Sequence, residues 1–313
     1  MRNIIIDFMF SIYNTQQPML SYVVMKTMLN GYGGFMSYRI VVDSCCELQE
    51  QYKNDARFRS VPLQLEVGDY KILDDENFNQ KEFLEKVASS PECPKSACPS
   101  PETFMEAYRG DEEEVFVVTL SSHLSGSYNS AEVGKDMYLE KYGDKKIHVV
   151  DSETASCGET QLAMLILQYK EAGLSFEETV EKVEAFKLKM RTYFVLDNLE
   201  TFRKNGRLTG VKALMVSSLN IKPIMVGVRG SIDQKGQAIG TNKALAKMAD
   251  YLVSDVPDSK DRVLMITHCN CPDRAEYMRE LMVKRASFKD IVIMDMAGVS
   301  SLYANDGGVI ATL

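Results

Sequence analysis

The chain has 313 residues, a formal net charge of −8 at pH 7 and 45% hydrophobic residues. This length is enough for about two domains, and the apolar content is ordinary for a globular protein. An acidic chain without a long basic run has no electrostatic footprint for nucleic acid or for an anionic membrane surface. We therefore expect neither nucleic acid nor membrane as a partner.

Residues 1–35 differ in composition from the rest of the chain. They are rich in Met and Tyr, and they show no sustained periodicity. No apolar run among them reaches the about 18 residues of a membrane span, and a secretory signal is a poor match. Because Met36 is followed at once by the strand pattern "YRIVVDS", we interpret residues 1–35 as a misplaced start or a non-core extension. A real amphipathic extension is the alternative.

Strands alternate with helices from Tyr38 to about residue 172. This alternation is typical of βαβ units and predicts a mostly parallel sheet. We expect strands at 39–43, at 114–120 and at 146–151, and one or two strands with a Gly-Asp turn within 60–73. We expect helices near 47–53, 80–88, 101–108, 127–141 and 157–172. We predict an N-terminal α/β, Rossmann-like domain over residues 36–172.

The second half continues the alternation in a more mixed form. The segment "GVRGSID" at 227–233 predicts a hairpin, which a purely parallel sheet would not contain. We expect helices over 175–190, 211–219, 242–253 and 274–284, and strands over 192–197, 221–228, 261–268 and 290–295. We predict a separate, mixed α/β domain over residues 173–313.

The cysteines do not form a recognisable metal or disulfide pattern. No paired Cys-x-x-Cys spacing is present, and only three histidines accompany them. The seven thiols are those of Cys45, Cys46, Cys93, Cys98, Cys157, Cys269 and Cys271. We expect reduced, buried or idle thiols in a cytoplasmic protein, with no metal and no cofactor.

The stretch "LSSHLSGSYNSA" at 120–131 lies between a predicted strand and a predicted helix. Free N–H groups at a helix start favour an anion, and the serine hydroxyls add donors. A nucleotide phosphate would normally also require a lysine in a glycine-rich loop, which is absent. A single carboxylate therefore fits better. The plain alternative is that Ser122 or Ser125 is a helix N-cap.

A serine-dependent hydrolase or acyltransferase using Ser122 or Ser125 is a further alternative, because His123 lies in the same stretch. However, "HLSGS" is not the Gly-x-Ser-x-Gly elbow, and a His two residues before a Ser is badly placed to act on it. We interpret His148 and His268, at strand ends, as structural. We predict no catalytic residue.

Six short segments carry a family resemblance. They are "VVDS" at 41 and at 149, "KSACPS" at 95, "LSSHLSGSYNSA" at 120, "NGRLTG" at 205 and "LNIKPIM" at 219. In this order they resemble the DegV family of bacterial fatty-acid-binding proteins. The resemblance implies two α/β domains with one long-chain fatty acid in the cleft between them. It also implies a separate fatty-acid kinase as partner, which phosphorylates the bound acid for phospholipid metabolism.

The resemblance also implies roles for individual residues. The family's carboxylate-binding positions fall on Ser96 and Ser125, and Arg207 falls on a loop near the kinase-facing surface. We add Ser122 and Gly126 as further candidate contacts to the head group. The aliphatic tail is then expected to supply most of the affinity, and the serines its orientation.

The chain departs from the family pattern at the head group. Ala97 and Cys98 replace a Ser and a Gln of the first motif, and Tyr303 replaces a His near the C-terminus. A phenol can donate a hydrogen bond to a carboxylate but cannot carry a positive charge. Tyr303 is therefore a further candidate contact, and a carrier of another apolar carboxylate is an alternative function.

Overall fold

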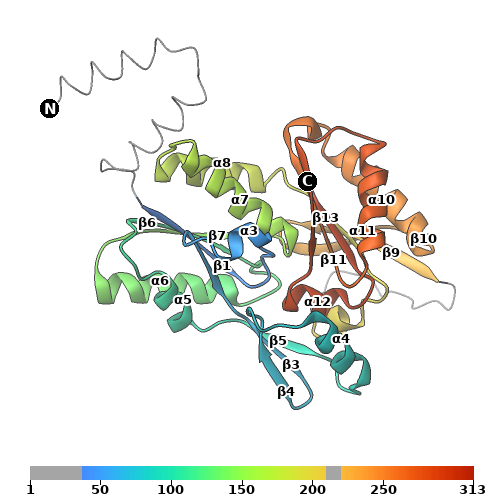
Figure 1. Cartoon of the computed structure of the whole chain (residues 1–313), viewed down its shortest axis with the longest axis horizontal. Coiled ribbons are helices and arrows are strands. Elements are labelled where there is room, and N and C mark those ends of the chain that lie inside the picture. Colours follow the sequence, from blue (N-terminus) through green and yellow to red (C-terminus); the bar gives the residue numbers. More distant parts are fainter. Residues whose placement is uncertain (1–36, 209–219) are drawn as a thin grey trace, which may run out of the picture. The chain divides into compact units, whose positions relative to one another are not determined.

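The computed structural model of the protein describes residues 37–208 and 220–313 (Figure 1). Two predictions lie outside these ranges: the extension at residues 1–35 and the helix at 211–219. Residues Tyr38–Leu313 group into one compact unit.

The first sheet is fully parallel, where a mostly parallel sheet was predicted. Its strands run in the order β2-β1-β6-β7, and β1 pairs with β2 on one side and β6 on the other. The strands are β1 (Tyr38–Asp43), β2 (Phe58–Val61), β6 (Glu114–Thr119) and β7 (Lys146–Asp151). All six residues of β6 are buried, because helices cover both faces of a parallel sheet.

Helices pack on both faces of this sheet. On one face, Val41 and Val117 contact α5 (Pro101–Ala107) and α6 (Ser127–Tyr142) in one apolar cluster. On the other face, the neighbouring strand residues pack against α7 and α8. These two helices are α7 (Cys157–Glu171) and α8 (Phe176–Lys187). Helix α8 thus shares the core of the first sheet, although it follows the predicted domain boundary at residues 172–173. The boundary itself stays a prediction.

The second sheet has six strands in the order β10-β9-β8-β13-β11-β12. Only the β11–β12 pair is parallel, and β9 and β10 form the predicted hairpin. This mixed pairing confirms the predicted fold class of the second half. The strands are β8 (Thr192–Val195), β9 (Ile221–Val228), β10 (Ser231–Ile239), β11 (Val263–His268), β12 (Asp290–Asp295) and β13 (Val309–Thr312).

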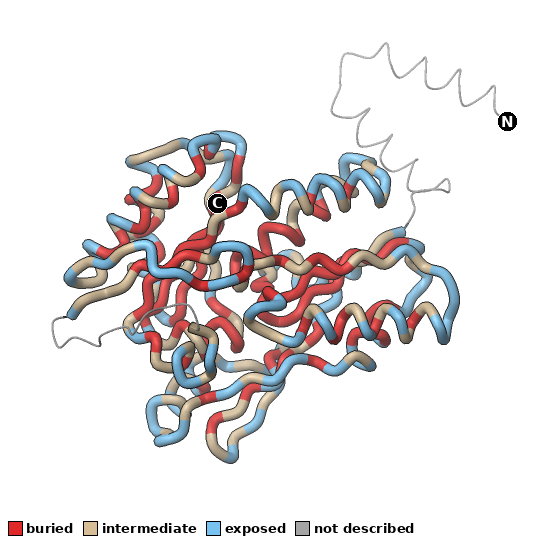
Figure 2. The backbone as a smooth tube through the Cα atoms, turned by 180° about the vertical axis from the view of Figure 1, so that it is seen from behind, coloured by how far each residue is buried: buried red, intermediate tan, exposed pale blue. Residues whose placement is uncertain are grey.

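The remaining elements include the helices that cover the second sheet and a small third sheet. Helices α10 and α11 pack on one face of the second sheet, and buried residues concentrate in both sheets (Figure 2). A third, antiparallel sheet has the order β4-β3-β5. These elements are β3 (Gln64–Val67), β4 (Tyr70–Leu73), β5 (Lys95–Ala97), α3 (Glu50–Lys53), α4 (Gln80–Ser89), α9 (Glu200–Lys204), α10 (Thr241–Asp255), a 3-10 turn (Ser259–Asp261), α11 (Pro272–Val283) and α12 (Gly298–Ala304).

The structure differs from the predicted elements in a few places. Helix α3 begins at Glu50 and not at Glu47, because the Glu47 side chain is buried and accepts hydrogen bonds in the interior. Strand β5, helices α9 and α12 and strand β13 were not predicted. Ser100 caps α5, as its position before Pro101 predicts, with its hydroxyl accepting the Thr103 N–H at 3.3 Å.

Two further findings concern the part of the chain that the structure describes. In the two described ranges, no helix combines the length and the apolar character needed to cross a bilayer. The seven cysteines, all of them in the described ranges, are free thiols.

Candidate functional site

One cavity lies where the two large sheets meet. Concave, mostly apolar cavities of this kind are typical of small-molecule sites. Leu120 and Ala155, which follow strands of the first sheet, form one side, and Phe194 and Ile232 of the second sheet form the other. Most of the lining is apolar, so the cavity suits a ligand with a long hydrocarbon part.

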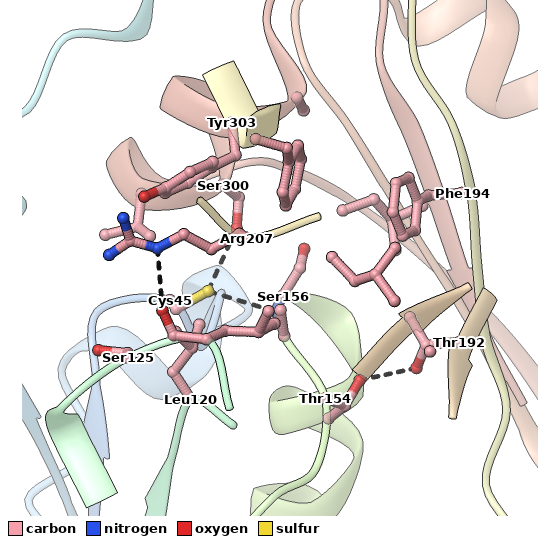
Figure 3. A pocket seen from close by; sticks show the side chains of 18 of the residues that line it. Cys45, Leu120, Ser125, Thr154, Ser156, Thr192, Phe194, Arg207, Ser300 and Tyr303 are labelled. Atoms are coloured by element: carbon pink, nitrogen blue, oxygen red, sulfur yellow. Dashed lines mark hydrogen bonds between the residues drawn. The ribbon is translucent and has the colours of Figure 1, made fainter. Parts of the chain in front are cut away.

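Ser125, Arg207 and Tyr303 lie at one end of this cavity, which we call the serine end (Figure 3). Ser96 also lines the cavity and belongs to this end, because it lies within hydrogen-bond distance of Tyr303. The hydroxyls of Ser96, on β5, and Tyr303, on α12, lie 3.4 Å apart. The structure thus brings together three candidates that are far apart in the sequence, Ser96, Ser125 and Tyr303. These hydroxyls can donate to an anionic group of a ligand.

Ser125 stands at the start of α6. Its hydroxyl oxygen accepts the Ser127 N–H at 3.2 Å and lies 3.1 Å from the Ser127 hydroxyl oxygen. The N-cap position itself belongs to Gly126, which has no side chain to cap the helix. Ser125 therefore supports the first turn of α6 locally and still lines the cavity.

Arg207 supplies the positive charge of the serine end. Its Nε donates to the carbonyl of Leu124 at 3.2 Å, and its guanidinium lies 5.9 Å from the centre of the Tyr303 ring. Sequence reasoning assigned Arg207 to a partner surface and missed its place in the cavity wall. The sequence carried one indication of this role. A carboxylate site favours a cation, the serine-rich segments contribute none to the serine end, and Arg207 is cationic.

Ser122 and Gly126 do not line the cavity. The Ser122 hydroxyl donates to a carboxylate oxygen of Asp151 at 2.5 Å, so it is turned to that side chain. Gly126 instead allows a close approach: a Cβ there would lie 2.9 Å from the Cys98 sulfur. The structure therefore gives no support to head-group contacts of these two residues, which stay a prediction.

Thr154 and Thr192 line the cavity away from Ser125 and Arg207, and we call this the threonine end (Figure 3). Their hydroxyl oxygens are 2.8 Å apart, and Thr192 is 2.9 Å from the hydroxyl of Thr312. Because these hydroxyls bond to one another, an apolar chain can end beside them without stripping them of partners.

Helix α12 carries Tyr303, and a buried carboxylate holds its N-terminus. Asp74 accepts the N–H groups of Gly298 and Val299 at 2.7 and 2.8 Å. A Cβ on Gly298 would lie 2.5 Å from an Asp74 oxygen, so this contact requires a glycine. Burial raises the pKa of Asp74 to about 6.

A second buried carboxyl group, that of Glu47, lies behind the cavity wall. It accepts the hydroxyl of Ser156, a lining residue, at 2.9 Å and the N–H of Ala297 at 3.4 Å. Burial raises the pKa of Glu47 to about 7. Sequence reasoning missed both Asp74 and Glu47, because nothing in a charged residue's local sequence shows that the fold will bury it.

A third buried acid positions the segment that begins at Leu120. Asp43, at the end of β1, accepts the N–H of Leu120 at 2.8 Å and that of Cys45 at 3.0 Å. Burial and the charge of Asp43 hold the pKa of Glu159 well above its usual range. Among the described residues, neither carboxyl oxygen of Glu159 has a hydrogen-bond partner.

The three histidines have polar contacts away from Ser122 and Ser125. His123 Nδ1 lies 3.0 Å from the hydroxyl of Ser231, and His148 Nε2 lies 3.1 Å from a Glu184 oxygen. His268 Nδ1 accepts the N–H of Cys271 at 3.4 Å. Neither candidate serine is therefore paired with a histidine base in the arrangement described.

Comparison with known proteins gives consistent relatives over nearly the whole described chain. The crystal structure of a DegV family protein from Ruminococcus gnavus, refined with vaccenic acid, is 49% identical, covers 89% of this chain and 100% of that one, and has a TM-score of 0.87. The Fatty Acid Kinase (Fak) B3 protein of Streptococcus pneumoniae, loaded with linoleic acid, is 31% identical with a TM-score of 0.81 and covers 88% of this chain and 99% of that one.

Sequence relatives and a family model agree with these structures. A DegV domain-containing protein of Streptococcus pneumoniae is 35% identical over 284 residues, 88% of this chain and 98% of that protein. The family model described as "Uncharacterised protein, DegV family" matches residues 37–312. The chain therefore belongs to the DegV family.

Proposed function

We propose that this protein binds one long-chain fatty acid, with the carboxylate at the serine end and the hydrocarbon tail along the apolar remainder of the cavity. The observation that carries the proposal is a mainly apolar cavity with three hydroxyl groups and one guanidinium group gathered at one end. The fatty acids in the related R. gnavus and S. pneumoniae structures support the same ligand class.

The energetics favour the tail as the source of affinity. Each buried methylene group contributes about 0.8 kcal/mol, so a long chain supplies several times the free energy of one hydrogen bond. The serine end selects for an anionic head group and fixes its orientation. Ser96, Ser125 and Tyr303 provide donors, and Arg207 provides charge.

We further propose that the protein is a cytoplasmic carrier that presents the carboxylate to a separate fatty-acid kinase, which forms the acyl-phosphate. The S. pneumoniae relative is named as a Fatty Acid Kinase (Fak) protein, and this name supports a kinase as partner. Arg207 stays our candidate for the contact with the kinase, beside its place at the serine end. The separation of the candidate serines from the histidines supports a carrier over a serine hydrolase.

A titration of the wild type, Ser96→Ala and Ser125→Ala with a long-chain fatty acid tests the carboxylate site. Each variant loses one hydrogen bond to a charged group, worth about 1.5 to 3 kcal/mol, so we expect the affinity to fall about tenfold to a hundredfold. The affinity for a fatty alcohol of equal length should change much less. Ser122→Ala is the matched control, because its hydroxyl faces Asp151 and not the cavity.

The same variants separate carrier from enzyme. A catalytic serine would leave ligand affinity nearly unchanged on mutation and abolish the turnover of an ester substrate. Esterase activity that disappears in Ser125→Ala would contradict the carrier function. Unchanged affinity in both Ser96→Ala and Ser125→Ala would contradict the proposed carboxylate site.

A further inference from the structure

Strand β9 places a glycine at the threonine end of the cavity. Gly227 is the register partner of Thr192 across the β8–β9 pair, and both residues line the cavity. Side chains alternate along a strand. Ile224 and Val226 belong to the core beneath α10, whereas Met225 belongs to the cluster on the cavity side. Position 227 therefore faces the cavity.

The backbone does not require a glycine at this position. Gly227 has no left-handed φ, and a Cβ built on it would meet only atoms of Thr192, at 3.8 and 3.9 Å, which is ordinary contact. Gly230, also in the cavity wall, is different. Its φ is +80°, and a Cβ there would lie 2.6 Å from the Ser121 hydroxyl oxygen. Only Gly227 can thus be replaced without strain, and its missing side chain leaves space inside the cavity.

We propose that Gly227 is a specificity-determining residue that sets how long an acyl chain the cavity accepts. This inference rests on the proposed fatty-acid function. It identifies the part of the cavity wall that limits the length of the hydrocarbon tail. With the carboxylate at the serine end, the terminal carbons of a long acid lie at the threonine end beside Gly227. A side chain at position 227 would occupy the volume that these carbons need.

Gly227→Ala and Gly227→Leu, titrated with saturated fatty acids of about 12 to 18 carbons, test the proposal. Each methylene group that loses its burial weakens binding about fourfold. We expect Gly227→Leu to bind the longest acids at least about fifteenfold more weakly, equivalent to two such groups, and to bind the shortest acids as the wild type does. Gly227→Ala should give a smaller change in the same direction.

Val228→Leu is the matched control, because Val228 adjoins Gly227, is 44% exposed and does not line the cavity. It should keep the chain-length profile of the wild type. An equal loss of affinity for all chain lengths in Gly227→Leu, or an unchanged profile, would overturn the inference. If Gly227→Leu does not fold, the dependence of affinity on chain length in Gly227→Ala tests the inference by the same criteria. A wild type that binds no fatty acid of any length would instead contradict the proposed function itself.

Discussion

We expect Asp43→Ala to have a free energy of unfolding about 2 to 5 kcal/mol below that of the wild type at pH 7. The substitution leaves the buried N–H groups of Leu120 and Cys45 without their acceptor. Each unsatisfied buried polar group costs about 1 to 3 kcal/mol. Urea unfolding of the purified variants measures the difference.

Glu159→Gln is the informative control for this prediction. Glutamine is neutral, and a Glu159 whose pKa is held well above its usual range is also neutral, so this variant should be nearly as stable as the wild type. Among the described residues, neither Glu159 oxygen has a hydrogen-bond partner, so the substitution removes no such bond. Equal stability of Asp43→Ala and wild type would contradict the role of Asp43, and a large loss in Glu159→Gln would contradict the protonated state of Glu159.

We expect the protein to become less stable as the pH rises from about 4.5 to 7. Glu47 has a folded-state pKa of about 7 against an ordinary value of 4.5, and Asp74 one of about 6 against 3.8. A carboxyl group whose pKa is raised on folding binds its proton more tightly in the native state. The stabilisation that this proton gives is therefore complete below the pKa of the group in the unfolded state. It is lost as the pH rises through the pKa of the group in the folded state.

Each of these two groups lowers the free energy of unfolding by an amount on the order of 3 kcal/mol as it ionises. The loss falls between about pH 4.5 and 7 for Glu47 and between about pH 4 and 6 for Asp74. Denaturant unfolding at several pH values measures the slope. Glu47→Gln cannot ionise and should flatten the upper part of the curve. A stability that rises with pH over this range in the wild type, or a Glu47→Gln curve parallel to it, would contradict the assignment.

Hydrophobic patterning was sufficient to predict most of the fold. The apolar runs in β1 and β6 are long and bounded, and the alternation with amphipathic helices indicated a parallel sheet. Helix α12 could not be predicted, because its seven residues lack a local cap and its first N–H groups are satisfied by Asp74, 224 positions earlier in the sequence. Strand β13 has four residues at the chain end and depends on its pairing with β8 and β11.

The candidate site was predictable only where residue type and local motif coincided. Ser96 and Ser125 stand in short polar motifs before helices, and the structure places both at one cavity end. Ser122 stands in the same motif but turns to Asp151, a contact that depends on the register of β6 and β7. Gly227 carries no chemical signal at all, because its contribution is empty space that only the packed structure defines.

Native mass spectrometry of the purified wild-type protein, followed by extraction and identification of the released lipid, tests the central claim most directly. A long-chain acid buries many methylene groups in a largely apolar cavity, so it should remain bound through purification. We predict a species heavier than the polypeptide by the mass of one fatty acid, which denaturation releases. A protein that carries no lipid, and that takes up no long-chain fatty acid when one is added, would contradict the account.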